Sequence, residues 1–236
     1  MEGILLVDKP AQWTSFDVVN YVRRVVSRSQ KLPPKKVKVG HSGTLDPFAT
    51  GLLIVLVGKT YTKQAEKLLK LDKRYLAEAR LGEVSTTGDP EGSIRPYKDK
   101  IIPPQVKDLE LAIEQFRGEQ QQIPPAFSAI KVGGKRAYQL ARESKPVELK
   151  PRKIFIKEIK LKNYEYPLVQ IEVSVSSGTY IRTLIEDLGI SLGTGAYTTS
   201  LRRLAVGSYD IAQAIKPEQI NEESIKGQLG SYRLIG

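Results

Sequence analysis

The most restrictive feature of the sequence is a twelve-residue segment, Gly40–Gly51, that contains three glycines and one proline. It runs directly into the longest uninterrupted apolar stretch, Leu52–Val57. Glycine and proline at this density would weaken a strand interior, so the segment predicts a loop. Asp46 precedes Pro47 and is therefore biased toward extended or turn geometry. The six apolar residues that follow are typical of a fully buried strand.

Strands and helices are both expected along the rest of the chain. Val169, Ile171, Val173 and Val175 alternate with polar residues, which indicates a half-buried strand. We also expect strands at 4–7, 75–81, 151–162 and 201–209, a helix capped by Ser15, and helices over 60–71, 104–116 and 180–192. Many strands lie too close in sequence for regular crossover connections, which favours an α+β fold over a doubly wound sheet.

Length and charge limit the function classes. The 236 residues suffice for one large domain, or one domain with a small appendage, and 40% of them are apolar. Lys and Arg number 37 against 26 Asp and Glu, a net charge of +11 that points to a polyanionic partner. No apolar run is long enough to span a bilayer, so we expect no membrane partner and a cytoplasmic location.

Several kinds of site are excluded by residue type or spacing. The absence of cysteine rules out disulfides and thiolate metal sites, and the single histidine, His41, rules out a histidine-rich metal centre. Gly58-Lys59-Thr60 resembles the end of a phosphate-binding loop, but Leu53 stands where that loop needs a glycine. We therefore expect neither a metal nor a nucleotide cofactor. On spacing alone, a structural turn at Asp46 and a structural His41 remain the favoured interpretations.

The segment 40–51, Gly-His-Ser-Gly-Thr-Leu-Asp-Pro-Phe-Ala-Thr-Gly, resembles the signature of the TruB family, the tRNA pseudouridine-55 synthases. Other stretches agree with the family in the same order: 8–10 with 14–15, 72–75, 178–182 and 201–204. Together they cover about residues 2–209.

The resemblance implies a fold. It is a mixed, mainly antiparallel sheet with flanking helices, a central cleft and a protruding arm, or thumb, that grips RNA. Residues 1–209 would form the catalytic domain, with 118–148 as the arm. The tail, 210–236, is too short for the RNA-binding PUA module of typical bacterial members. It would be a helical remnant packed on the catalytic domain, or the substrate preference would differ.

The resemblance also implies a reaction on tRNA. A uridine in the T-loop, at position 55, is flipped out of its stack, its glycosidic bond is cut, and C5 of the uracil is joined to C1′. Asp46 matches the catalytic aspartate, and the sequence leaves open whether it attacks C6 or C1′. Arg182 matches the arginine that keeps this carboxylate ionised and oriented. Tyr75 matches the tyrosine that stacks on the uracil and takes part in removing the C5 proton.

The remaining family positions would bind the substrate. His41 would occupy the space left by flipped bases, and Tyr180 and Leu201 would line the pocket. Phosphate contacts are expected from cations in the motifs and on the arm, namely Lys63, Arg202, Arg203, Lys131, Lys135, Arg136 and Arg142. The stretch 8–10 would support the Asp46 loop.

The expected protein is thus a monomeric tRNA pseudouridine synthase without a cofactor, acting on the T-arm. Two alternatives remain open: a tRNA folding chaperone whose catalysis is secondary, and an RNA uracil N-glycosidase. The range of RNA targets does not follow from the sequence.

Overall fold

The computed structural model describes residues 1–128, 130–143, 148–229 and 232. The chain forms two compact units, which are described separately below. Unit 1 comprises Met1–Tyr75 and Arg202–Gly236, and unit 2 comprises Leu76–Leu201. The strands β4 (Lys73–Leu81) and β12 (Ala196–Val206) contribute residues to both units.

Unit 1 is built on a mixed sheet, as expected for an α+β protein. β1 (Gly3–Lys9) runs antiparallel to β3 (Thr50–Val57) along its whole length. The short β2 (Val39–Ser42) is also antiparallel to β3, whereas β12 is parallel to it at Thr50 and Gly51. The predicted buried strand at 52–57 is therefore confirmed, and β3 pairs with three other strands.

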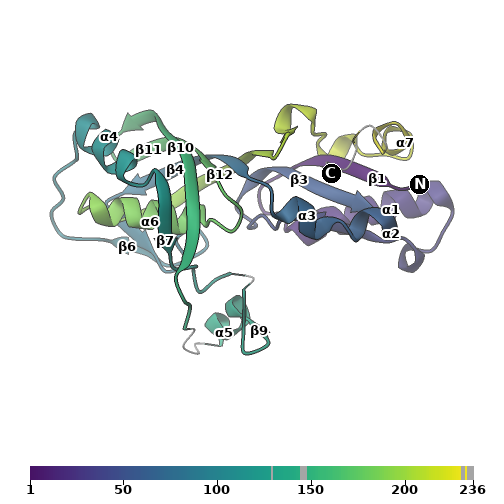
Figure 1. Cartoon of the computed structure of the whole chain (residues 1–236), viewed down its shortest axis with the longest axis horizontal. Helices are drawn as coiled ribbons and strands as arrows, with labels where there is room; N and C mark the ends of the chain where they lie inside the picture. The colour runs from purple at the N-terminus through teal and green to yellow at the C-terminus, as the bar shows by residue number, and fades with distance from the viewer. Residues whose placement is uncertain (129, 144–147, 230–231, 233–236) are drawn as a thin grey trace. The chain divides into compact units, whose positions relative to one another are not determined.

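The two faces of β3 bury alternate residues, because successive side chains of a strand point to opposite faces. Leu53, Val55 and Val57 pack with the valines of α1 (Ser15–Gln30) and with the C-terminal segment that contains η3 (Pro217–Gln219) and α7 (Ser224–Gln228). Leu52, Ile54 and Leu56 pack with α3 (Ala65–Leu69) and with β13 (Tyr209–Asp210). Figure 1 shows α1 and α3 with β1 and β3.

Two local expectations for unit 1 need correction. The N-cap of α1 is Thr14, whose hydroxyl accepts from the Asp17 amide at 3.1 Å, while the Asp17 carboxylate accepts from the Thr14 amide at 2.8 Å. Thr14 and not the expected Ser15 therefore caps the helix, through a reciprocal capping box. The Ser15 hydroxyl can then form hydrogen bonds outside the helix. The helix expected over 60–71 consists of two short helices, α2 (Lys59–Thr62) and α3.

Unit 2 combines a sheet with helices. Its strands follow the order β12, β4, β11 (Leu168–Val175), β10 (Arg152–Glu165) and β7 (Gly118–Gln122). The helices α4 (Val106–Gln115) and α6 (Ile181–Ser191) confirm the predicted helical stretches, and β5 (Glu83–Ser85) pairs with β6 (Ile94–Pro96). None of the helices in the described residues has the length and apolar character that crossing a membrane requires.

The segment expected as an arm begins inside this sheet, because Gly118–Gln122 is β7 and pairs with β10. Beyond it, β8 (Lys131–Val132) and β9 (Lys135–Arg136) form a hairpin that is followed by α5 (Ala137–Arg142). Figure 1 shows β9 and α5 set apart from the sheet of unit 2. Residues 129 and 144–147, and the side chains of Lys131, Arg136 and Arg142, lie outside the description.

Candidate functional site

The loop that carries Asp46 is held on its C-terminal side by a buried lysine. Lys9 is fully buried at the end of β1, and its ammonium donates to the carbonyls of Pro10, Trp13 and Pro47 at 2.9, 2.5 and 3.2 Å. The Gln12 amide donates to the same Pro47 carbonyl at 2.8 Å. A buried ammonium needs such partners. The stretch 8–10 thus supports the loop, as expected.

The N-terminal side of the loop is held by Ser15. Its buried hydroxyl accepts from the Leu45 amide at 2.9 Å and donates to the Leu45 carbonyl at 3.2 Å. Asp46, which follows, is half-buried, and its carbonyl accepts from the Ala49 amide at 3.1 Å. The residues before and after Asp46 are therefore both fixed by side chains from the N-terminal end of unit 1.

Arg203 was expected to contact a phosphate of the RNA, but the structure buries it. It is 1% exposed, and its guanidinium donates to the carbonyls of Leu52 and Gly43 at 2.7 and 3.0 Å. Beside it, Gly51 has a φ of +102°, and a Cβ there would come within 2.4 Å of the Arg203 carbonyl. Only glycine fits this close approach. Arg203 holds the two ends of the Asp46 loop together, and its cation does not reach solvent.

Arg202 is also engaged within unit 1, although it is partly exposed. Its guanidinium makes a two-pronged ion pair with the Asp8 carboxylate, at 2.7 and 3.0 Å. A bidentate pair of this kind fixes both side chains, so a phosphate would have to compete with Asp8. Lys63 is exposed at the end of α2, and no ion pair to it is found in the described part of the chain.

His41 and Tyr75 are the other expected site residues of unit 1. His41 lies on β2 opposite Val55, and burial lowers the pKa of its imidazole, with the nearby Arg203 cation adding to the effect. The ring is therefore neutral near pH 7. Its Nδ1 is buried without a hydrogen-bond partner among the described residues. Tyr75 lies on β4 and is 8% exposed.

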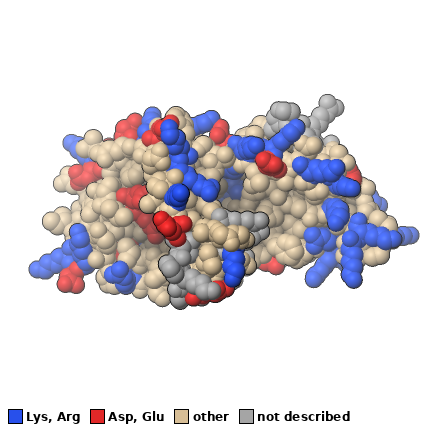
Figure 2. Space-filling model, turned by 60° about the horizontal axis from the view of Figure 1, so that its bottom comes forward, with Lys and Arg blue, Asp and Glu red and all other residues tan. Residues whose placement is uncertain are grey.

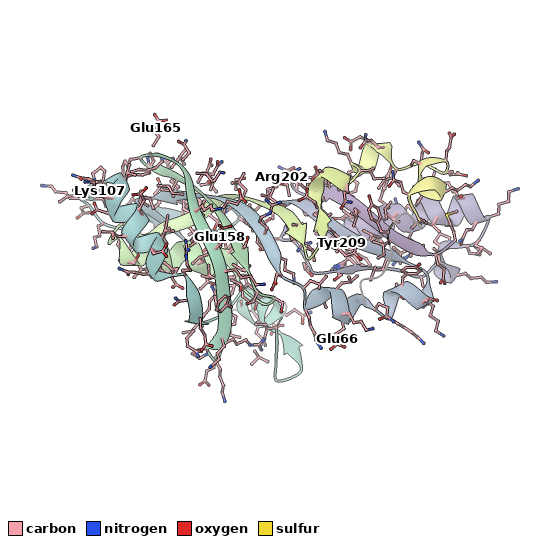
Figure 3. All side chains as sticks on the ribbon, turned by 45° about the horizontal axis from the view of Figure 1, so that its top comes forward. Glu66, Lys107, Glu158, Glu165, Arg202 and Tyr209 are labelled. Atoms are coloured by element: carbon pink, nitrogen blue, oxygen red, sulfur yellow. The ribbon has the colours of Figure 1, made fainter. Side chains whose placement is uncertain are left out.

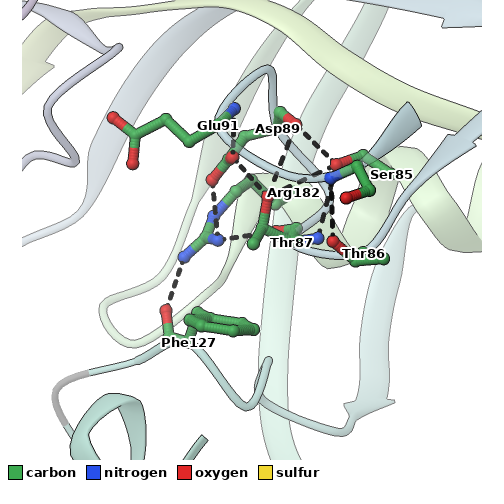
Figure 4. Close-up of polar contacts among 8 residues, drawn as sticks. Ser85, Thr86, Thr87, Asp89, Glu91, Phe127 and Arg182 are labelled. Carbon is green, nitrogen blue, oxygen red and sulfur yellow. Dashed lines mark hydrogen bonds and ion pairs between the residues drawn. The ribbon is translucent and has the colours of Figure 1, made fainter. Parts of the chain in front are cut away.

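In unit 2 the central side chain is Arg182, in the first turn of α6 (Figure 4). Its Nη1 donates to the Asp89 carboxylate at 2.9 Å and to the Thr87 carbonyl at 2.7 Å, and its Nη2 donates to the Phe127 carbonyl at 2.8 Å. Each side chain of the Arg182–Asp89 pair is 5% exposed. A buried charge requires a partner of this kind, so Asp89 fixes the orientation of the guanidinium.

Asp89 was not among the residues expected from the sequence. Its second carboxylate oxygen accepts from the Thr87 hydroxyl at 2.5 Å and from the Glu91 amide at 3.0 Å. The one available signal was local: Asp89 precedes Pro90, as Asp46 precedes Pro47. Its partner is 93 residues away, which no local pattern indicates.

A second acidic side chain, Glu186, lies one turn after Arg182 on α6. Burial raises the pKa of its carboxyl to about 7; Arg182 opposes this shift, and Asp187 and Asp89 add to it. Gly88, with a φ of +72°, leaves room for the Glu186 carboxyl, because a Cβ at position 88 would lie 2.7 Å from Glu186 Oε1.

The remaining expected residues also lie in unit 2. Tyr180 is the N-cap of α6, so it is separated from Arg182 by a single residue, and Leu201 on β12 is 6% exposed. Unit 1 thus contains Asp46, His41 and Tyr75, whereas Arg182 and Tyr180 belong to unit 2. The pairing of Asp46 with Arg182 stays a prediction. Among the described residues, no cluster of acidic or histidine side chains is arranged to hold a metal ion.

Comparison with known proteins gives matches over nearly the whole chain. Residues 28–181 match the model of the TruB family pseudouridylate synthase N-terminal domain, and residues 182–232 match that of the tRNA pseudouridylate synthase B C-terminal domain. A tRNA pseudouridine synthase B of Parabacteroides distasonis is 44% identical over 222 residues, which cover 93% of this chain and 92% of the relative. That of Clostridium kluyveri is 43% identical, with 95% of this chain and 74% of the relative covered.

Solved structures are similar as well. The crystal structure of a Cbf5-Nop10-Gar1 complex contains a chain that is 28% identical, with a TM-score of 0.66 over 91% of this chain. An H/ACA RNP bound to a substrate RNA containing 2′-deoxyuridine gives 25% identity and a TM-score of 0.64 over 92%. This chain spans about half of each of those chains, 52% and 51% respectively.

Proposed function

The chain belongs to the TruB family of pseudouridylate synthases, and we propose that it converts uridine 55 in the T-loop of tRNA to pseudouridine. The observation that carries the proposal is the immobilised Asp46 loop. Ser15 holds the residue before Asp46, and Lys9 holds the residue after it. A fixed carboxylate suits a reaction at the junction of sugar and base, because a positioned group needs no reorganisation at the moment of reaction.

The isomerisation balances without a cofactor. The N1–C1′ bond breaks, the uracil rotates, and C5 bonds to C1′; the C5 proton leaves and N1 gains one. We propose that Asp46 is the nucleophile in this series of steps. Arg182, oriented by Asp89, would hold the Asp46 carboxylate ionised while the RNA excludes water.

The aromatic and imidazole side chains would contact the bases of the RNA. A neutral His41 is suited to stacking or to one hydrogen bond in the space left by an extruded nucleotide. Tyr75 would stack on the target uracil and take part in removing its C5 proton. Tyr180 and Leu201 would line the pocket, as the family resemblance implies.

Affinity for the T-arm would come from exposed cations on unit 1. Residues 18–65 contain nine Lys or Arg and one acid, Asp46 itself. Figure 2 shows blue side chains grouped on the visible face of this unit, with few red ones among them. Cations without acidic neighbours bind phosphates independently of sequence. Lys63 belongs to this group of cations. We also propose that the enzyme acts as a monomer.

The proposal is tested by mapping pseudouridine in unmodified tRNA after incubation with the purified protein. Carbodiimide modification followed by reverse transcription should give one new stop, at the nucleotide directly 3′ of position 55. A tRNA with cytidine at position 55 is the control substrate and should give none. A stop at another site, or release of free uracil in place of a stop, would refute the assignment.

A further inference from the structure

A buried glutamine far from the sequence motifs contacts the segment that carries Arg182. Gln122 ends β7 and is 3% exposed. Its Nε2 donates to the Tyr180 carbonyl at 3.0 Å, and its Oε1 accepts from the Tyr180 amide at 2.8 Å. The side-chain amide therefore pairs with both backbone groups of Tyr180, as a neighbouring strand would.

Tyr180 needs this partner because of its place in the chain. It is the N-cap of α6, its backbone is extended, and it has no side-chain capping bond. Its carbonyl accepts from Leu184 in the first helical turn, but its amide lies outside the helical ladder. A buried amide without a partner is costly. Gln122 supplies that partner and thereby fixes where the helix that carries Arg182 begins.

The same stretch of chain contacts Arg182 directly a few residues later. We call residues 123–128 the arm root. Its Phe127 carbonyl accepts from Arg182 Nη2 at 2.8 Å, as Figure 4 shows. Pro124 and Pro125 have no amide hydrogen, so the arm root cannot continue the ladder of β7. The chain is thus tied to the start of α6 on both sides of Pro124 and Pro125, by Gln122 at the end of β7 and by Phe127 in the arm root.

We propose that Gln122 is a positioning residue for the isomerisation, which holds Tyr180 and Arg182 in one arrangement with the arm root. This inference rests on the proposed function. The guanidinium of Arg182 is set from two sides, by Asp89 and by the arm root. Loss of the Gln122 amide would remove both of its hydrogen bonds to the Tyr180 backbone, and the guanidinium would then occupy several positions relative to Phe127.

Glutamine is suited to this place because it offers both a donor and an acceptor. Methionine has a similar length and offers neither. In an ionised glutamate, one oxygen could still accept from the Tyr180 amide, but the other would place an acceptor against the Tyr180 carbonyl. A protonated glutamate again has one donor and one acceptor. Burial favours the protonated form, so Gln122→Glu should be competent at low pH and fail as the pH rises through the carboxyl's raised pKa.

The test compares wild type, Gln122→Met, Gln122→Glu and the control Gln121→Met, which changes an exposed residue of the same type on the same strand. We would measure the single-turnover rate with saturating tRNA, the tRNA dissociation constant and the thermal midpoint. Gln122→Met should lose about 10- to 100-fold in rate, since a displacement of about 1 Å can cost two orders of magnitude. Its tRNA affinity and that of the control should stay within about threefold of wild type.

The Gln122→Glu variant tests the inference within one folded protein, even if Gln122→Met does not fold. Its rate, divided by that of wild type at each pH, should approach one near pH 6 and fall toward pH 9. A constant ratio would overturn the inference, and so would a folded Gln122→Met with an unchanged rate or with a defect in tRNA affinity alone. If wild type itself forms no pseudouridine, it is the proposed function that fails.

Discussion

Glu186 should make the stability of the protein fall as the pH rises through neutrality. Burial raises the pKa of its carboxyl from 4.5 to about 7, against the opposing charge of Arg182. The folded state therefore holds this proton more tightly than the unfolded chain does. The resulting stability is fully present below about pH 4.5 and is lost as the pH rises through about 7.

The size of the effect follows from the shift. One pKa unit corresponds to about 1.36 kcal/mol, so the full shift would give about 3.4 kcal/mol. Because the side chain is only partly buried, solvent screening reduces this to about 2 kcal/mol. Glu186→Gln removes the ionisation while keeping the shape of the side chain. It should therefore stabilise the protein by about 2 kcal/mol at pH 8.5 and by only about 0.8 kcal/mol at pH 5.

Urea unfolding followed by circular dichroism at the two pH values measures this difference. Glu165→Gln, which changes an exposed carboxylate (Figure 3), is the matched control and should show no such pH dependence. Equal stabilisation by Glu186→Gln at pH 5 and pH 8.5 would refute the reasoning. A destabilised Glu186→Gln at pH 8.5 would show that the carboxylate is bound as an anion in the folded protein.

Three further changes test other parts of the site. Asp89→Asn removes the charge of one carboxylate that pairs with the buried Arg182, and should lower the free energy of unfolding by about 3 kcal/mol and slow the single-turnover rate. Unchanged urea melting would argue against a buried pair. Ser15→Ala leaves the Leu45 amide without its partner and should cost about 1 to 3 kcal/mol while tRNA affinity is kept, which calorimetry and filter binding would check. Lys63→Ala should make the plot of log affinity against log salt shallower by about 0.7 to 0.9, and an unchanged slope would remove Lys63 from the phosphate contacts.

The sequence predicted those parts of the fold that local patterns determine. The glycines and proline around Asp46 marked a loop, but the two ends of the predicted segment, 40–42 and 50–51, belong to the strands β2 and β3. The apolar run after it marked the buried strand β3. Alternation identified β11, and helical spacing identified α1. These features depend on neighbours within a few residues, so a single sequence contains the information needed.

Features that depend on distant partners were missed. Gln122 and Tyr180 are 58 residues apart, and Asp89 and Arg182 are 93 apart. The two arginines of β12 looked alike as motif cations, yet Arg203 is buried and Arg202 is not. One signal was available, since Arg203 lies two residues after the buried Leu201 and therefore on the same face of its strand.

The most direct measurement of the central claim is the fate of uridine 55 when the protein carries Asp46→Asn. The substitution removes the carboxylate from a loop held by Ser15 and Lys9, so the loop and the tRNA-binding cations should be preserved. Asp99→Asn, at an exposed aspartate, is the matched control. We expect Asp46→Asn to bind tRNA within about tenfold of wild type and to form no pseudouridine, because phosphate contacts dominate binding. Pseudouridine formed by Asp46→Asn at the wild-type rate would contradict the assignment of Asp46 as the nucleophile.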